Sequence, residues 1–230
     1  MLETLPSPSP LLLWGFTLLP IVVAGCVIIA ISKTNNVKAS RIALIVYSAW
    51  MALTGLLSWC GMLDSWTPPR MFLIIIPMIV GLVWASRQKW TDRLGDLSLS
   101  LLVGFQSFRI IVELLLHQAV TEGIAHPTMT WSGTNLDIIP GATALLLAPF
   151  ADRLKPSLLQ AWNLISAAIL VVTVVTAISA TPSPFRQIMG EPANGFVAGF
   201  PYVWLPAILV SSAWLGHIVL FRRLRKLNQA

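Results

Sequence analysis

LLLWGFTLLPIVVAGCVIIAIS, the stretch from Leu11 to Ser32, contains no charged residue. A helix rises about 1.5 Å per residue, so about 20 apolar residues cross the roughly 30 Å of hydrocarbon in a bilayer. This stretch is long and apolar enough to be a membrane-spanning helix. It indicates that lipid surrounds much of the protein.

The whole chain is also rich in apolar residues and poor in charged ones. Of its 230 residues, 56% are hydrophobic and only 10% are charged, whereas a soluble domain carries about 25% charged residues. So much apolar surface exceeds what one water-soluble core of this length could bury. We therefore predict an all-α, polytopic transmembrane helical bundle that forms a single integral membrane domain over residues 1–230.

Apolar runs along the chain predict about seven spans. They cover residues 11–32, 42–63, 71–86, 99–120, 137–150, 158–179 and 201–221. The third and fifth are short for complete spans. The fifth could instead be a re-entrant segment that needs protein around it. That alternative gives six spans and places both termini on one side.

The distribution of basic residues favours seven spans, because short cytoplasmic loops collect Lys and Arg. Twelve of the fifteen basic residues follow the first, third, fifth and seventh predicted spans, and only Arg70 and Arg186 fall in the opposite loops. The pattern predicts an external N-terminus and a cytoplasmic C-terminus. Since anionic lipid headgroups attract the same residues, the net charge of +6 needs no nucleic-acid partner.

The predicted span at 99–120 differs from the others because it carries charges deep within an apolar run. Gln106, Arg109, Glu113 and His117 recur at i, i+3, i+7 and i+11, so they share one helical face. At this spacing Arg109 and Glu113 can form an ion pair. An isolated charge in mid-membrane costs from about 2.5 to more than 10 kcal/mol, so this face must turn toward protein or water.

This polar face permits two interpretations. In the first, Arg109 and Glu113 form a buried ion pair that fixes helix packing, and His117 forms a hydrogen bond at the interface. In the second, a polar cavity opens to the outside; there Arg109 orients an anionic or carbonyl group, and Glu113 or His117 exchanges protons.

The polar loop that follows adds three candidate residues. We predict that His126, Asn135 and Asp137 form a lid or wall of the site. Alternatively, Asn135 is the N-cap of the next helix and Asp137 is an acid in its first turn, where Pro140 is tolerated.

The sequence predicts no metal site and no cofactor. His126 and the nearby acidic residues could join Glu113 and His117 around a metal, but their spacing is not that of a known metal-binding motif. His117 and His217 are not expected to hold a haem, because residue counting places them roughly 18 Å apart along the membrane normal.

Two segments carry a resemblance to known proteins. FRIIVELLLH at Phe108 to His117 and PTMTWSGTNLDIIPGATA at Pro127 to Ala144 resemble segments of small, multi-pass bacterial membrane proteins of unassigned function. The resemblance implies a bacterial inner membrane and a link between the polar span and the loop. It implies no activity and no site residues.

The sequence is compatible with three functions. The first is binding or transport of a small solute, with or without proton coupling. The second is a membrane-embedded enzyme that acts on a lipid or isoprenoid near the outer leaflet; Glu113 or His117 would then be the acid or base, and Arg109 would hold a phosphate or carboxylate. The third is a structural or assembly subunit. Membrane lipids are expected partners, and an oligomer is compatible with each function.

Overall fold

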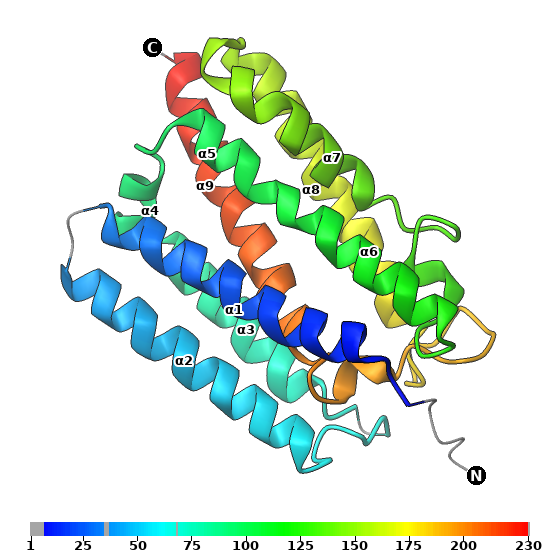
Figure 1. The fold of residues 1–230 in the computed structure, drawn as a ribbon. Coiled ribbons are helices and arrows are strands. Elements are labelled where there is room, and N and C mark those ends of the chain that lie inside the picture. The colour runs from blue at the N-terminus through cyan, green and yellow to red at the C-terminus, as the bar shows by residue number, and fades with distance from the viewer. Residues whose placement is uncertain (1–6, 35–36, 68, 230) are drawn as a thin grey trace.

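The computed structural model describes residues 7–34, 37–67 and 69–229 (Figure 1). Helices form the regular secondary structure of these ranges, which contain one isolated bridge between Trp66 and Pro69 and no strand. The prediction of an all-α fold is confirmed.

The α-helices lie in the following order along the described ranges: α1 (Pro10–Ser32), α2 (Val37–Trp59), α3 (Phe72–Ser86), α4 (Lys89–Leu94), α5 (Leu99–Gly104), α6 (Phe108–Thr121), α7 (Ile138–Leu147), α8 (Pro156–Ser179) and α9 (Ser211–Gln229). The 3₁₀ helices are η1 (Phe105–Ser107), η2 (Pro127–Met129), η3 (Ala148–Arg153) and η4 (Phe196–Ala198), and the π-helix η5 (Leu205–Val210) leads into α9. The short helix α4 was not predicted from the sequence.

Within the described ranges, five helical segments are long and apolar enough to cross a membrane. They are Pro10–Ser32, Val37–Trp59, Leu99–Thr121, Pro156–Ser179 and Leu205–Gln229. Each overlaps one predicted span. The other two predicted spans correspond to α3 with 15 residues and α7 with 10 residues. The fold is therefore compatible with a multi-pass membrane protein, and complete crossing by α3 and α7 stays a prediction.

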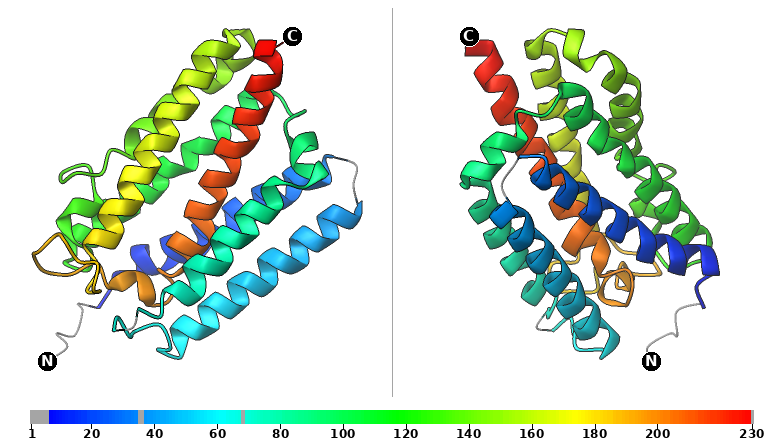
Figure 2. Two further views of the ribbon diagram at one scale, coloured as in Figure 1. Left: turned by 180° about the vertical axis from the view of Figure 1, so that it is seen from behind. Right: turned by 60° about the vertical axis from the view of Figure 1, so that its left-hand side comes forward.

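The connections gather at two ends of the bundle (Figures 1 and 2). At the first, Asp152 accepts hydrogen bonds from the amide of Leu99 at 2.9 Å and the hydroxyl of Ser100 at 2.7 Å. There α4 also meets α9 through a 3.4 Å ion pair between Asp92 and Arg222. We call this the basic end. It contains the segments with these basic residues: Lys33, Lys38, Arg41, Arg87, Lys89, Arg93, Arg153, Lys155, Arg222, Arg223, Arg225 and Lys226.

The opposite end, which we call the far end, joins the start of α1 to the end of α6. The amide of Ser9 donates to Oε2 of Glu122 at 2.9 Å, and Gln118 donates to Oε1 at 2.7 Å. Burial raises the pKa of Glu122, but these hydrogen bonds outweigh burial and lower the pKa below its usual value. Because α1 begins at the far end and α9 finishes at the basic end, the chain enters and leaves at opposite ends (Figure 1).

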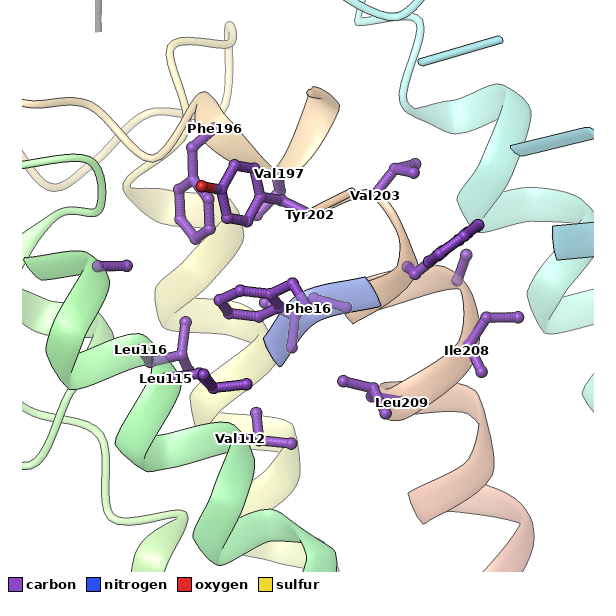
Figure 3. Close-up of a cluster of buried hydrophobic side chains, with 14 of the residues drawn as sticks. Phe16, Val112, Leu115, Leu116, Phe196, Val197, Tyr202, Val203, Ile208 and Leu209 are labelled. Atoms are coloured by element: carbon purple, nitrogen blue, oxygen red, sulfur yellow. The ribbon is translucent and has the colours of Figure 1, made fainter. Parts of the chain in front are cut away.

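Two clusters of buried apolar side chains hold the helices together. The cluster nearer the far end surrounds Phe16, whose ring packs edge-on to that of Tyr202 with centroids 5.1 Å apart (Figure 3). The second cluster lies nearer the basic end and includes Val103 and Leu220. Between Val103 and Val112, which belong to different clusters, the chain buries Gln106 and Arg109 instead of apolar side chains.

Candidate functional site

Arg109 is the centre of a buried polar cluster. It projects from α6 and is only 1% exposed. Its Nε donates to Oδ2 of Asp137 at 2.8 Å, and its Nη2 donates to Oδ1 of the same carboxylate. A bidentate pair between Arg and a carboxylate is among the strongest side-chain interactions, and it gives this buried cation a matched partner.

The expected ion pair between Arg109 and Glu113 is wrong. In the described ranges, the salt bridge of Arg109 is to Asp137, and Glu113 instead accepts a hydrogen bond from Nδ2 of Asn135 at 2.7 Å. The reason is geometric: Asp137 approaches from outside α6 and can meet both Nε and Nη2. Residue counting within one helix did not include this partner.

Gly141 allows this approach. It lies on α7 one turn after Asp137, against the backbone of α6. A Cβ atom at Gly141 would lie 2.9 Å from the amide nitrogen of Ile110 and 3.3 Å from the carbonyl carbon of Arg109. Small residues let helix backbones come close in membrane bundles. The close approach at Gly141 therefore places Asp137 within reach of Arg109.

Asn135 connects the two carboxylates of the cluster. Its Nδ2 donates to Glu113 and also to the carbonyl of Met129 at 2.9 Å. Its Oδ1 accepts from the amide of Asp137 at 3.0 Å and from the hydroxyl of Thr173 at 2.9 Å. Asp137 occupies the N-cap position of α7, but its side chain makes no capping bond. The structure thus places the N-cap at Asp137 instead of the predicted Asn135, and the Asp137 carboxylate pairs with Arg109 instead of capping the helix.

His217 extends the cluster to α8 and α9. Its Nε2 lies 3.2 Å from Nη1 of Arg109, and its Nδ1 lies 2.8 Å from Oδ1 of Asn163. Since the guanidinium can only donate, Nε2 must accept, and a neutral imidazole with its proton on Nδ1 satisfies both contacts. From the sequence, His217 was considered only as a haem ligand, which its depth argues against, and Asn163 was not predicted. An Asn and a His within two apolar helices were the available signal.

The other predicted site residues lie outside this cluster. Gln106 donates to the carbonyl of Ala213 at 3.1 Å, and its Oε1 has no hydrogen-bond partner among the described residues. The ring of His117 stacks on Trp131 with centroids 4.2 Å apart. His126 accepts from the amide of Thr128 at 3.2 Å through Nδ1.

Of the seven predicted residues, the structure therefore brings four into direct contact, Arg109, Glu113, Asn135 and Asp137. A search of the described chain finds no group of three or more His, Cys, Asp and Glu residues placed to hold a metal ion.

A cavity of about 170 Å³ reaches the cluster between α3, α6, α8 and η5. Asn135, Asp137 and Thr173 line its polar part, and Asn194 lines it in the loop before η4. The remaining walls are mostly apolar, with Met71, Ile75, Val112, Leu170, Ala177 and Leu205 among the lining residues. Apolar walls with a few convergent polar groups are typical of small-molecule sites. A known cavity of about 150 Å³ accommodates benzene, so this one suits a single ring or a short chain.

Asn194 gives this cavity a second polar group. It is fully buried, and its Nδ2 donates to the carbonyl of Ala177 at 3.2 Å. Its Oδ1 has no hydrogen-bond partner in the described chain. Most buried polar atoms have one.

Comparisons of the chain with known protein families, with curated proteins and with solved structures found no match. The resemblance to small bacterial membrane proteins stays a prediction.

The first prediction concerns the Arg109–Asp137 pair. Asp137→Leu should lower the free energy of unfolding by about 3–5 kcal/mol, because it leaves a buried cation without its counter-charge. The double variant Arg109→Met/Asp137→Leu should recover most of this loss. Denaturation of the purified protein in detergent micelles measures both. If Asp137→Leu unfolds like the wild type, the pair does not stabilise the bundle.

The second prediction concerns helix approach at Gly141. Gly141→Ala should destabilise the protein by about 1–3 kcal/mol, because the added methyl group overpacks the contact with α6. Gly25→Ala on α1 is the matched control, since a Cβ atom there meets no atom within 4 Å. Thermal unfolding in the same detergent compares the two. Equal melting temperatures would contradict a close contact at Gly141.

Proposed function

We propose that this protein is a multi-pass protein of a bacterial inner membrane that binds a small, mainly apolar molecule carrying a hydrogen-bond donor. The observation that carries the proposal is the cavity that ends on Asn135, Asp137 and Thr173. The oxygen acceptor at this end is the Asp137 carboxylate, whose Oδ1 lies 3.4 Å from the hydroxyl of Thr173.

The charge of the cluster favours a neutral ligand over an ion. Arg109 already neutralises Asp137, and Glu113 does not line the cavity, so the groups that face a ligand carry no net charge to attract an ion. A neutral alcohol, phenol or amide can donate to an oxygen of the cluster without leaving a second buried charge. The proposed ligand is therefore a neutral solute with a small apolar body. Binding is the proposed activity, and transport of the same solute would be a further step.

The size of the cavity makes the lipid-enzyme alternative less suitable. Pockets for drug-sized ligands span about 300–1,000 Å³, whereas this cavity measures about 170 Å³. A whole phospholipid or a long-chain isoprenoid is larger than this cavity.

A structural role is the second candidate function. It is favoured by the continuity of the cluster, which joins α6 and α7 to Asn163 and Thr173 on α8 and His217 on α9. In that case the polar groups fix helix packing, and the cavity binds nothing.

The proposed topology places the basic end in the cytoplasm and the far end outside. The clustering of twelve basic residues at one end supports it, because cytoplasmic loops collect Lys and Arg. In this topology α3 and α7 complete a set of seven crossings. The loop with Asn194 then lies on the external side of the cavity.

Binding can be tested with 4-fluorophenol, which has the proposed donor, and 4-fluorotoluene, which lacks it. In ¹⁹F NMR of protein in nanodiscs, 4-fluorophenol should bind saturably and about fivefold more tightly than 4-fluorotoluene, as one net hydrogen bond predicts. Ala177→Phe should abolish binding because it fills the cavity. Ala168→Phe on the exposed face of α8 is the control. If folded wild type shows no saturable binding, the structural role becomes the better explanation.

Topology can be tested with single cysteines in a Cys26→Ser/Cys60→Ser background. Gln187→Cys should react with an impermeant thiol reagent in intact cells, and Lys89→Cys should react only after the membrane is opened. Both positions are exposed. The reverse pattern would invert the topology, and reaction of both in intact cells would refute the proposed arrangement.

A further inference from the structure

A larger apolar groove lies between α2 and α3 and measures about 610 Å³. The two helices lie side by side, but α2 packs chiefly on α1 while α3 packs on α9 and η5 (Figure 2). Trp50 and Tyr47 from α2 and Met78 and Leu82 from α3 are among the residues that line it. The groove therefore follows from two helices that pack on different neighbours.

The length of the groove matches one lipid leaflet. Its α2 wall extends from Lys38 to Leu53, which is about 22 Å at the helical rise. Half of a hydrocarbon core is about 15 Å, which leaves several ångströms for the headgroup region near Lys38. A lipid acyl chain lying along α2 would thus extend from the basic end toward the middle of the bundle.

The mouth of the groove carries unpaired positive charge. Lys38 lines it. Three further cations do not line it but are close to lining residues in the sequence: Arg41 on α2, and Arg87 and Lys89 on either side of Gln88. In the described ranges none of these four cations has an ion pair. Two acidic residues lie nearby, Asp92 in α4 and Asp96 in the turn after it. Both form ion pairs with α9 instead: Asp92 pairs with Arg222, and Asp96 pairs with Arg223. Trp84 and Trp90 also line the groove, and Trp is enriched where membrane helices meet the headgroups.

We propose that this groove binds one anionic phospholipid of the leaflet at the basic end, with an acyl chain between α2 and α3 and its phosphate beside Lys38. Charge complementarity favours this occupant. A second copy of the chain docked symmetrically through the same groove would bring two sets of unpaired cations together. The site is separate from the proposed solute cavity, and the two can fail independently.

Gly81 provides a steric test of the groove. It lines the groove, and a Cβ atom there meets no atom within 4 Å, so Gly81→Phe can fill the space without a clash at its Cβ. Gly25 on α1 has the same open surroundings but lines neither this groove nor the small solute cavity. Gly25→Phe is therefore the matched control. Lys38→Gln removes the charge at the mouth and keeps the apolar walls.

The experiment reconstitutes each variant in nanodiscs of phosphatidylglycerol and phosphatidylcholine in equal amounts. Native mass spectrometry after transfer to detergent then reports the retained lipid and the oligomeric state. Wild type and Gly25→Phe should retain one phosphatidylglycerol. Lys38→Gln should lower the preference for phosphatidylglycerol about fivefold, the effect of one basic residue near an anionic surface. Gly81→Phe should lose the lipid.

Two results would overturn the proposal. If folded Gly81→Phe retains phosphatidylglycerol as well as Gly25→Phe does, the lipid binds elsewhere. If wild type is a dimer without bound lipid and Gly81→Phe is a monomer, a second copy occupies the groove. A melting temperature for each variant identifies any that fails to fold, and Gly81→Leu then replaces Gly81→Phe as the smaller filling variant.

Discussion

The bidentate pair between Arg109 and Asp137 is the interaction on which the polar cluster depends. A guanidinium group buried among apolar helices needs a carboxylate at hydrogen-bonding distance, because the cost of burying it alone is several kcal/mol. That requirement brings α7 against α6, and it explains why Gly141 lies where a larger side chain would separate the two helices. The remaining contacts position this pair. Asn135 holds the backbone of Asp137, and His217 accepts from the free edge of Arg109.

The same cluster explains how the short helix α7 can belong to a bundle of longer apolar helices. Irregular backbone is tolerated beside apolar helices when protein groups bond its polar atoms. Ahead of α7, Asn135 satisfies the carbonyl of Met129 and the amide of Asp137. Thr173 then ties Asn135 to α8. The loop before α7 is thus bonded to its neighbours through side chains rather than through regular secondary structure.

The π-helix η5 separates the two cavities to which we assign ligands. Pro206 and Val210 face the small cavity beside the Arg109–Asp137 pair, whereas Ala207 faces the groove between α2 and α3. The carbonyl of Ala207 accepts from Nε1 of Trp50 at 3.3 Å and from the hydroxyl of Ser211 at 2.9 Å. Side chains thus bond a carbonyl within this irregular turn. A π-helical segment is rare, and such segments occur often at functional sites.

Local composition and helical period are enough to predict an all-α fold, the five long apolar helices, and the burial of Arg109 and Glu113 on one face. Apolar length and the 3.6-residue repeat are properties of a single segment, so no partner is needed to predict them. By contrast, the packing of the helices determines that Arg109 pairs with Asp137 instead of Glu113, and that His217 and Asn163 join them. Those contacts, and the cavities on either side of η5, depend on how far each helix is shifted and tilted against its neighbours. Residue counting along one helix contains no information about that offset, because it arises from packing between segments distant in the chain.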